Sequence, residues 1–220
     1  MLKRSRTPGL LILFSALGVL GSACAAAAPA AAVEGTDYRL LAAPQPTATP
    51  GKLEVLEFFS YACPHCNEFY PLVSAWAAKL PKDVAFNRVA VGFGRPVWVN
   101  LARAYYALRA SGDFDKLDGA LFHALHEEHL QLVDEGSLAD WVGKNGGHED
   151  KFAAAYTSFG VNNDTARADE MVQSYTVDAV PTLVIDGRYI VRGDSFAEIL
   201  NNADKVIALA RSTPAAKRTK

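Results

Sequence analysis

Two cysteines separated by two residues could carry chemistry in this chain, in the run Cys63-Pro64-His65-Cys66. Thiols at this spacing can close a small disulfide ring or open to give a reactive thiol. The chain has three cysteines, and the third is Cys24, close to the N-terminus. If the N-terminus is removed, the pair must account for any thiol chemistry, and we predict a thiol–disulfide oxidoreductase.

The residues around the pair predict which cysteine reacts. Cys63 follows the apolar run Leu53–Phe59 and begins a predicted helix, so unpaired backbone N–H groups and the positive end of the helix dipole should favour its thiolate. Pro64 suits the first helical turn, and a protonated His65 would add a cation. A stabilised reduced form gives up its disulfide readily, which favours an oxidant. Cys66, one turn later, should be less exposed and act as the resolving thiol.

A structural disulfide and a metal site are the alternative roles for the pair. A disulfide closed over so few residues constrains little of the unfolded chain, so its stabilising effect should be small. A zinc site usually has four protein ligands, and the sequence has no second cysteine pair. His123, His126 and His129 recur at steps that turn progressively around a helix, and we predict no metal site there.

Glu57 is the second candidate. By alternation it lies with Val55 and Phe59 on one side of a strand that should be buried on both faces. A buried carboxylate needs a raised pKa or a partner, and Glu57 could relay a proton to or from Cys66. The alternatives are an ion pair with a lysine or exposure at a sheet edge. Glu54, on the other alternation, is predicted to lie on the surface.

Val180-Pro181-Thr182 is the third candidate, immediately before a predicted strand. Proline at the start of a strand avoids breaking a ladder of hydrogen bonds, and that alone could account for its position. A cis peptide bond would instead expose the Val180 backbone for pairing with an extended substrate. The sequence leaves cis and trans open.

The N-terminus predicts export. Lys3, Arg4 and Arg6 precede the apolar stretch Leu10–Leu20 and a run of small residues, so we predict a signal peptide over residues 1–30 and an exported protein. Lipid modification of Cys24 and a retained membrane anchor are the alternatives. Removal of residues 1–30 would change the formal net charge from −2 to −5, which argues against nucleic acid as a partner.

Hydrophobic periodicity predicts a mixed α/β fold. Strands are expected over residues 36–41, 52–59, 83–91, 182–185 and 188–191, with Asp186-Gly187 as a hairpin turn. Helices are expected from Cys63 to about Leu80, at several sites between 97 and 160, from a cap at Asn162 or Asn163 to about Tyr175, and after Ser195. Ser137 is the predicted cap of one helix in the middle block, and Leu117, Leu121, Leu125 and Leu132 mark another. The predicted parts are therefore 31–96, an all-helical insertion 97–162, a second part 163–212, and a basic tail 213–220.

The segment from Val55 to Cys66, Val-Leu-Glu-Phe-Phe-Ser-Tyr-Ala-Cys-Pro-His-Cys, resembles the active-site segment of the DsbA family of periplasmic disulfide oxidases. Val177-x-x-Val180-Pro181-Thr182 resembles the cis-proline loop of that family, and the helical block between them matches its insertion. The resemblance covers essentially the whole mature chain. It implies a thioredoxin fold, with a mixed central sheet and flanking helices, interrupted by an all-helical insertion.

The resemblance also implies roles. Cys63 attacks, Cys66 resolves, His65 tunes the pair, Glu57 supports proton transfer, and Pro181 shapes a substrate groove together with Val180 and Pro64. The Cys63–Cys66 disulfide would act without a cofactor or metal. A monomer would oxidise reduced, unfolded exported proteins and be re-oxidised by a DsbB-like, quinone-linked membrane protein. The alternatives are an isomerase or reductase and, in a different class, a module that binds metal through Cys63, Cys66 and a histidine.

Overall fold

The computed structural model describes Leu2 and residues 31–213. Residues 1, 3–30 and 214–220 lie outside the described residues. They include Cys24, all of the predicted signal peptide except Leu2, and all of the predicted basic tail except Thr213. Within the described part of the chain, no helix has the length and apolar character needed to cross a membrane.

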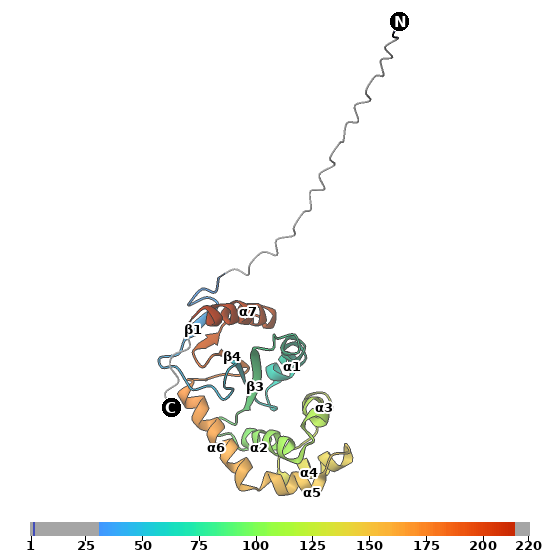
Figure 1. Ribbon diagram of the computed structural model, residues 1–220. Coiled ribbons are helices and arrows are strands. Elements are labelled where there is room, and N and C mark those ends of the chain that lie inside the picture. The colour runs from blue at the N-terminus through green and yellow to red at the C-terminus, as the bar shows by residue number, and fades with distance from the viewer. Residues whose placement is uncertain (1, 3–30, 214–220) are drawn as a thin grey trace.

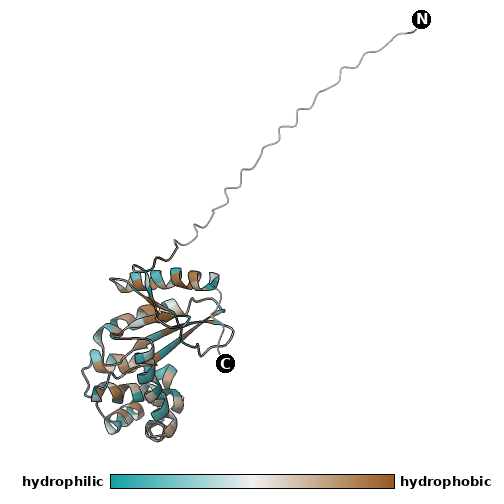
Figure 2. Cartoon of the chain, turned by 90° about the vertical axis from the view of Figure 1, so that its left-hand side faces the viewer, coloured by the Kyte–Doolittle hydropathy of each residue, from teal (hydrophilic) through white to brown (hydrophobic). Residues whose placement is uncertain are grey.

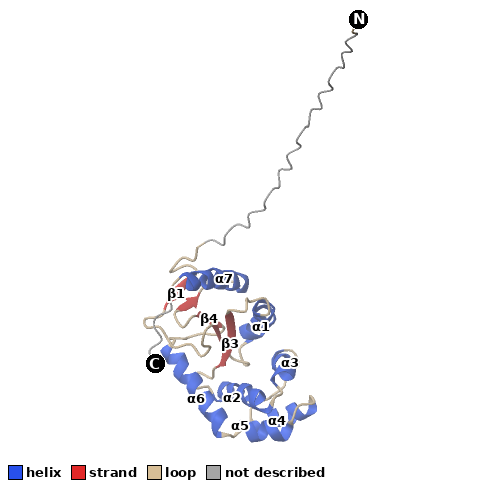
Figure 3. Cartoon of the chain, viewed as in Figure 1, coloured by secondary structure: helices blue, strands red, loops and turns tan. Residues whose placement is uncertain are grey.

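The strands of the described chain form one mixed sheet in the order β1-β5-β4-β2-β3 (Figures 1 and 3). Only β2 and β3 are parallel, and the other neighbouring pairs are antiparallel. The predicted mixed sheet is confirmed. The strands are β1 (Tyr38–Leu40), β2 (Leu53–Phe59), β3 (Val84–Ala90), β4 (Thr182–Ile185) and β5 (Tyr189–Val191).

Helices cover both faces of this sheet. Helices α1 (Pro64–Ala77) and α7 (Phe196–Ser212) pack on one face, where Val55 of β2 is fully buried. Helix α6 (Phe159–Ser174) and the segment after it cover the other face, where Leu56 and Phe58 are buried. The strand β2 is central because its residues are apolar toward both helical layers. Figure 2 shows brown and teal residues interleaved along α7, as expected for a helix with one buried face.

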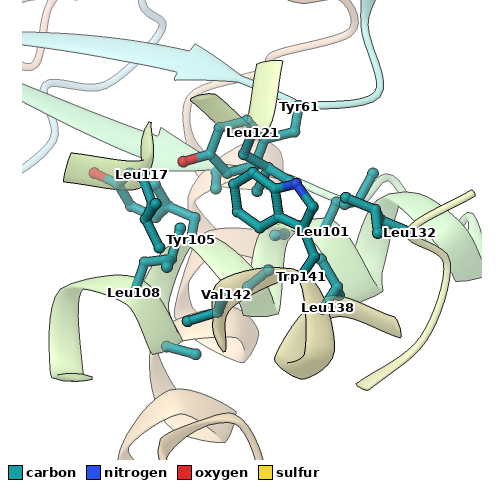
Figure 4. Close-up of a cluster of buried hydrophobic side chains, with 14 of the residues drawn as sticks. Tyr61, Leu101, Tyr105, Leu108, Leu117, Leu121, Leu132, Leu138, Trp141 and Val142 are labelled. Carbon is teal, nitrogen blue, oxygen red and sulfur yellow. The ribbon is translucent and has the colours of Figure 1, made fainter. Parts of the chain in front are cut away.

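The insertion is helical, as predicted, and has a core of its own. It consists of α2 (Pro96–Ser111), α3 (Phe114–His126), α4 (Glu135–Lys144) and α5 (Glu149–Tyr156). Trp141 of α4 lies among buried leucines of α2 and α3, and Tyr61, just before the cysteine pair, belongs to the same cluster (Figure 4). The core of the insertion therefore extends up to the segment that carries the cysteines.

Two predicted caps are wrong. Asp134, not Ser137, caps α4, because the two side chains form a reciprocal capping box in which the Ser137 N–H donates to Asp134 at 2.9 Å. Ser158, rather than Asn162 or Asn163, caps α6 and accepts from the Val161 N–H at 3.2 Å. As a result, α6 runs through the predicted division between residues 162 and 163.

Two predicted helix ends also differ. α1 ends at Ala77 rather than Leu80. α3 ends at His126, and Leu132 is buried from the loop that follows, so the leucine spacing continued beyond the helix.

The hairpin and the last cap are confirmed. Asp186 and Gly187 have φ angles of 52° and 62°, which a tight turn between β4 and β5 requires. A side chain at Gly187 would collide with the Gln45 carbonyl. Glycine therefore also lets the loop between β1 and β2, residues 41–52, which we call the lead-in loop, pack against the hairpin. Ser195 caps α7 by accepting from the Glu198 N–H at 3.2 Å.

The prediction that Glu54 lies on the surface is wrong. Its side chain is buried, and it accepts hydrogen bonds from the Ala48 N–H, the Thr49 hydroxyl and the Asn87 amide, the last at 2.8 Å. The lead-in loop folds over the start of β2 and supplies the first two of these donors. A carboxylate that is buried but surrounded by donors holds this loop against the sheet.

We expect Glu54→Gln to lower the free energy of unfolding by about 2 kcal/mol, because the new amide places a donor against donors it cannot pair with. Urea denaturation measures this loss. Glu34→Gln, at an exposed glutamate in the same N-terminal region, should change stability little. Equal stability of the two variants would contradict a structural role for Glu54.

Candidate active site

Cys63 is the N-cap residue of α1, with an extended backbone at φ −91° and ψ 117°. The strand β2 ends at Phe59, and the Cys63 N–H donates to the Ser60 carbonyl at 3.1 Å, which closes the turn into the helix. Pro64 is the first helical residue, where its missing N–H leaves no helical hydrogen bond unmade. Both cysteines are free thiols; Cys63 is 5% exposed and Cys66 is fully buried.

The two thiols differ in acidity. The pKa of Cys63 is lowered to about 6, chiefly by the hydrogen bond from the Cys66 thiol, while burial opposes the shift. The backbone N–H groups of Cys66 and His65 lower this pKa further. Burial raises the pKa of Cys66, and the neighbouring Cys63 adds to that rise. The site therefore favours a thiolate on Cys63 and a proton on Cys66.

His65 contributes less than the sequence suggested. Its side chain is 73% exposed, and its Nδ1 lies 3.8 Å from the Glu68 carboxylate. Its charge is the weakest of the influences that lower the pKa of Cys63, after its own backbone N–H. Because solvent screens an exposed charge, the helix terminus and Cys66 are the main sources of acidity.

The Val180-Pro181 peptide bond is cis, which decides the alternative that the sequence left open. The Val180 carbonyl lies beside the cysteine pair and accepts from the Cys63 thiol at 3.5 Å. Val180 and Pro181 also line a mostly apolar groove with His65, Phe196 and Ile199. The structure thus brings together the two segments that the sequence singled out separately.

Glu57 is fully buried, as predicted, and it is paired. The Arg88 Nε donates to Glu57 Oε2 at 2.7 Å, so the predicted alternative of an ion pair is realised with an arginine rather than a lysine. Burial raises the pKa of Glu57, against the opposing effect of Arg88. The charge of Glu57 also adds to the raised pKa of Cys66, which lies in the first turn of α1.

Arg88 and Asp118 were missed in the sequence. Arg88 is the only cation in β3, at the register position opposite Glu57, and its guanidinium stacks 3.7 Å from the centre of the Phe59 ring. Asp118 interrupts the apolar face of α3 and accepts from Arg88 Nη1 at 2.8 Å. In the sequence, the only sign of these two residues was a charged side chain at an inward-facing position of β3 and of α3. That Arg88 and Asp118 pair with each other is visible only in the tertiary structure.

The three histidines of α3 and its following loop do not converge. His126 Nε2 lies 2.7 Å from the Tyr61 carbonyl, and His123 pairs with Glu128. No group of three or more metal-binding side chains occurs among the described residues.

Comparisons with known proteins give one family. The family model described as a DSBA-like thioredoxin domain matches residues 54–203. The thiol:disulfide interchange protein DsbA of Burkholderia cepacia is 38% identical over 181 residues, covering 82% of this chain and 84% of that protein. The DsbA of Pseudomonas aeruginosa is 36% identical over 155 residues, covering 70% of this chain and 73% of that protein.

Comparison with solved structures identifies the same family. The crystal structure of DsbA from Xylella fastidiosa has a TM-score of 0.78 at 34% identity and covers 82% of this chain and 98% of its own. That of Pseudomonas aeruginosa DsbA has a TM-score of 0.77 at 34% identity, with 81% and 94% coverage. These similarities confirm the predicted thioredoxin fold with a helical insertion.

We expect Cys66→Ala to raise the pKa of Cys63 toward the ordinary thiol value of about 8.5, because the main donor to the thiolate is lost. His65→Leu should raise it by less. The measurement is a pH titration of thiolate ultraviolet absorbance in the reduced proteins. Cys66→Ser, which keeps a hydroxyl donor, is the matched control and should lie between Cys66→Ala and wild type. A larger shift in His65→Leu than in Cys66→Ala would contradict this assignment.

Proposed function

Because the chain belongs to the family of DsbA-like thioredoxin domains, we propose that this disulfide oxidoreductase is an oxidase that donates its Cys63–Cys66 disulfide to reduced exported proteins. The observation that carries the proposal is the contrast between the thiols, with the pKa of Cys63 lowered to about 6 and that of Cys66 raised. A pair whose reduced form is stabilised in this way tends to oxidise its partners.

The reaction would begin when a substrate thiolate attacks the Cys63 sulfur of the disulfide. A mixed disulfide between substrate and Cys63 forms, the Cys63–Cys66 bond breaks, and its electron pair passes to Cys66. A second substrate thiolate then attacks the substrate sulfur of the mixed disulfide. The substrate leaves with a disulfide, Cys63 leaves as a thiolate, and two electrons have passed from substrate to enzyme.

The leaving-group step explains why the acidity of Cys63 matters. Thiols of low pKa leave faster and accumulate as thiolates. The α1 N-terminus and the Cys66 thiol stabilise that thiolate once it is released. The same contacts that make Cys63 a good leaving group therefore favour complete transfer to the substrate.

Proton transfer falls to Glu57 in this proposal. Cys66 is buried, so a thiolate formed there must take up a proton. Glu57 is a neighbour whose burial raises its own pKa, which suits a group that holds a proton and passes it on. The raised pKa and the closeness to Cys66 support the role of a proton relay.

Substrate would bind across the cis-proline loop. The groove lined by Val180, Pro181 and Phe196 is mostly apolar, as suits the side chains of unfolded chains, and Pro64 lies at the start of the adjoining helix. We propose that a monomer acts in the periplasm after removal of residues 1–30. A DsbB-like, quinone-linked membrane protein would then re-oxidise the pair, which acts without a cofactor or metal.

We expect the oxidised wild-type protein to oxidise a reduced, unfolded test protein rapidly and Cys63→Ser to be inactive, because the attacked sulfur is lost. Cys66→Ala that first carries glutathione in a disulfide on Cys63 should form a mixed disulfide with a test protein that has one thiol, because the substrate thiolate attacks Cys63 and glutathione leaves; this mixed disulfide should persist because Cys66 is absent. Gel electrophoresis under non-reducing conditions and thiol alkylation measure both outcomes. Wild-type protein that has been reduced with dithiothreitol and then freed of it is the control, and it should oxidise nothing because its pair carries no disulfide.

Two results would favour the alternatives. Equilibration with a glutathione buffer gives the reduction potential of the cysteine pair. A potential as low as that of thioredoxin would support a reductase function and contradict the proposed oxidase function. Purified protein that retained stoichiometric zinc and oxidised nothing would support a metal-binding module.

We expect Glu57→Gln to slow oxidation most at neutral and higher pH, where a proton donor to Cys66 is scarce, by about 10-fold or more. Stopped-flow measurement of the reduction of the enzyme disulfide by dithiothreitol across a range of pH tests this. A variant with normal exchange rates and a large loss of stability would show that Glu57 is structural.

A further inference from the structure

Arg88 is shared by two buried carboxylates. Its Nε donates to Glu57 Oε2 at 2.7 Å, and its Nη1 donates to both oxygens of Asp118, at 2.8 and 3.1 Å. The side chains of all three residues are at most 9% exposed. Glu57 comes from the sheet and Asp118 from the helical insertion, so the guanidinium joins the two parts of the chain.

The two carboxylates accept different numbers of hydrogen bonds. Asp118 accepts both contacts from Arg88 Nη1 and a further hydrogen bond from the Tyr61 hydroxyl at 2.5 Å. Glu57 accepts one hydrogen bond at Oε2, and its Oε1 is buried without a partner among the described residues. Donors stabilise the ionised form of a carboxylate, and Asp118 accepts three such contacts where Glu57 accepts one.

One guanidinium cannot balance two buried carboxylates. With both ionised, the group of Glu57, Arg88 and Asp118 carries a net charge of −1, which is unfavourable where water is excluded. A single proton removes the excess, and the difference in donors directs it to Glu57. Environments that separate two neighbouring carboxyl groups in this way create one proton carrier and one fixed anion.

We propose that Asp118 is a positioning residue for proton transfer at the cysteine pair: by engaging Arg88 as a fixed anion, it leaves Glu57 to carry the proton that Cys66 receives. This inference rests on the proposed function, since it deepens the role of Glu57 there. The direction agrees with the raised pKa of Glu57, of which burial is the largest cause and to which Asp118 contributes.

The other titratable groups around this network do not supply a competing charge. The tyrosines are neutral because burial raises the pKa of each, to about 12 for Tyr70. The titratable or charged groups that face Glu57 and Arg88 are Cys66 and Tyr70 of α1, Tyr61 before α1, Tyr105 of α2, and Asp118 of α3.

Asp118→Asn is the direct test, because asparagine keeps the shape and can still accept from Arg88 and Tyr61. With the anion gone, the charge of Arg88 acts on Glu57 alone and lowers its pKa. We expect the titration midpoint of the Glu57 carboxyl carbon, followed by NMR, to fall by about one unit or more. Asp118→Glu, which restores the charge, should move the midpoint back toward wild type.

Asp113→Asn is the matched control. Asp113 is a second buried aspartate of the insertion, paired with His148 at 2.7 Å and bonded to Ser111, with no contact to Arg88. The Asp113→Asn substitution should destabilise the insertion without moving the titration midpoint of the Glu57 carboxyl. An equal shift in Asp113→Asn and Asp118→Asn would mean that the shift reports only a loosened insertion and would overturn the proposal.

The wild-type protein alone also tests the inference, whether or not the variants fold. On acidification, the Glu57 carboxyl signal should titrate with a midpoint above that of an ordinary glutamate, because burial raises its pKa. A Glu57 midpoint at or below the ordinary glutamate value would overturn the proposal.

Kinetics separate this inference from the proposed function. At a pH above both midpoints, the disulfide of Asp118→Asn should be reduced more slowly by about the fold-change in protonated Glu57, roughly tenfold for one unit. In a Glu57→Gln background, Asp118→Asn should have no further effect. A persisting effect there would refute transmission through Glu57. If the wild type oxidised no substrate but the carboxyl titrations behaved as expected, the oxidase function would fail while the charge relation stood.

Discussion

Cys63 and Cys66 are one helical turn apart, yet the site favours a thiolate on the first and a proton on the second. This difference depends on the junction after Phe59, where β2 ends and the chain turns into α1 with Cys63 at its N-cap and Cys66 in its first turn. The cis-proline loop then lies against Cys63 from one side and the core of the insertion against Tyr61 from the other. The acidity of one sulfur and the basicity of the other both follow from this one turn.

The second constraint is the charge held under that junction. Arg88 bridges a strand and a helix that lie far apart in the sequence, and the Phe59 ring covers one face of its guanidinium. Buried ion pairs of this kind add little net stability compared with apolar packing, but loss of one partner is costly because it leaves an uncompensated charge. The network therefore makes the insertion and the sheet depend on each other close to the cysteine pair. An apolar contact could join the two parts equally well, but it could not exchange a proton.

Local patterns predicted the parts of this molecule whose cause is local. The apolar run of β2, the Asp186-Gly187 turn and the Ser195 cap each act within a few residues, and each is found as expected. Predictions of helix caps were wrong where two side chains within one turn could each act as the N-cap, as Asp134 and Ser137 could. The burial of Glu54 and the partner of Glu57 depend on a folded loop and on a distant strand and helix, so spacing along the chain could not reveal them. The cysteine pair was found because both members lie in one short motif.

The position of β1 at the edge of the sheet has a consequence for the order in which the chain folds during synthesis. Its sheet partner is β5, so Tyr38–Leu40 stays without that neighbour until residues up to Val191 have emerged. The central strand β2 likewise waits for β4, since Val55–Phe58 pair with residues 182–185. Contacts between such distant segments close late and slow the folding of the whole chain. A sheet that takes strands from both ends of the sequence is therefore completed only after nearly the whole chain has been made.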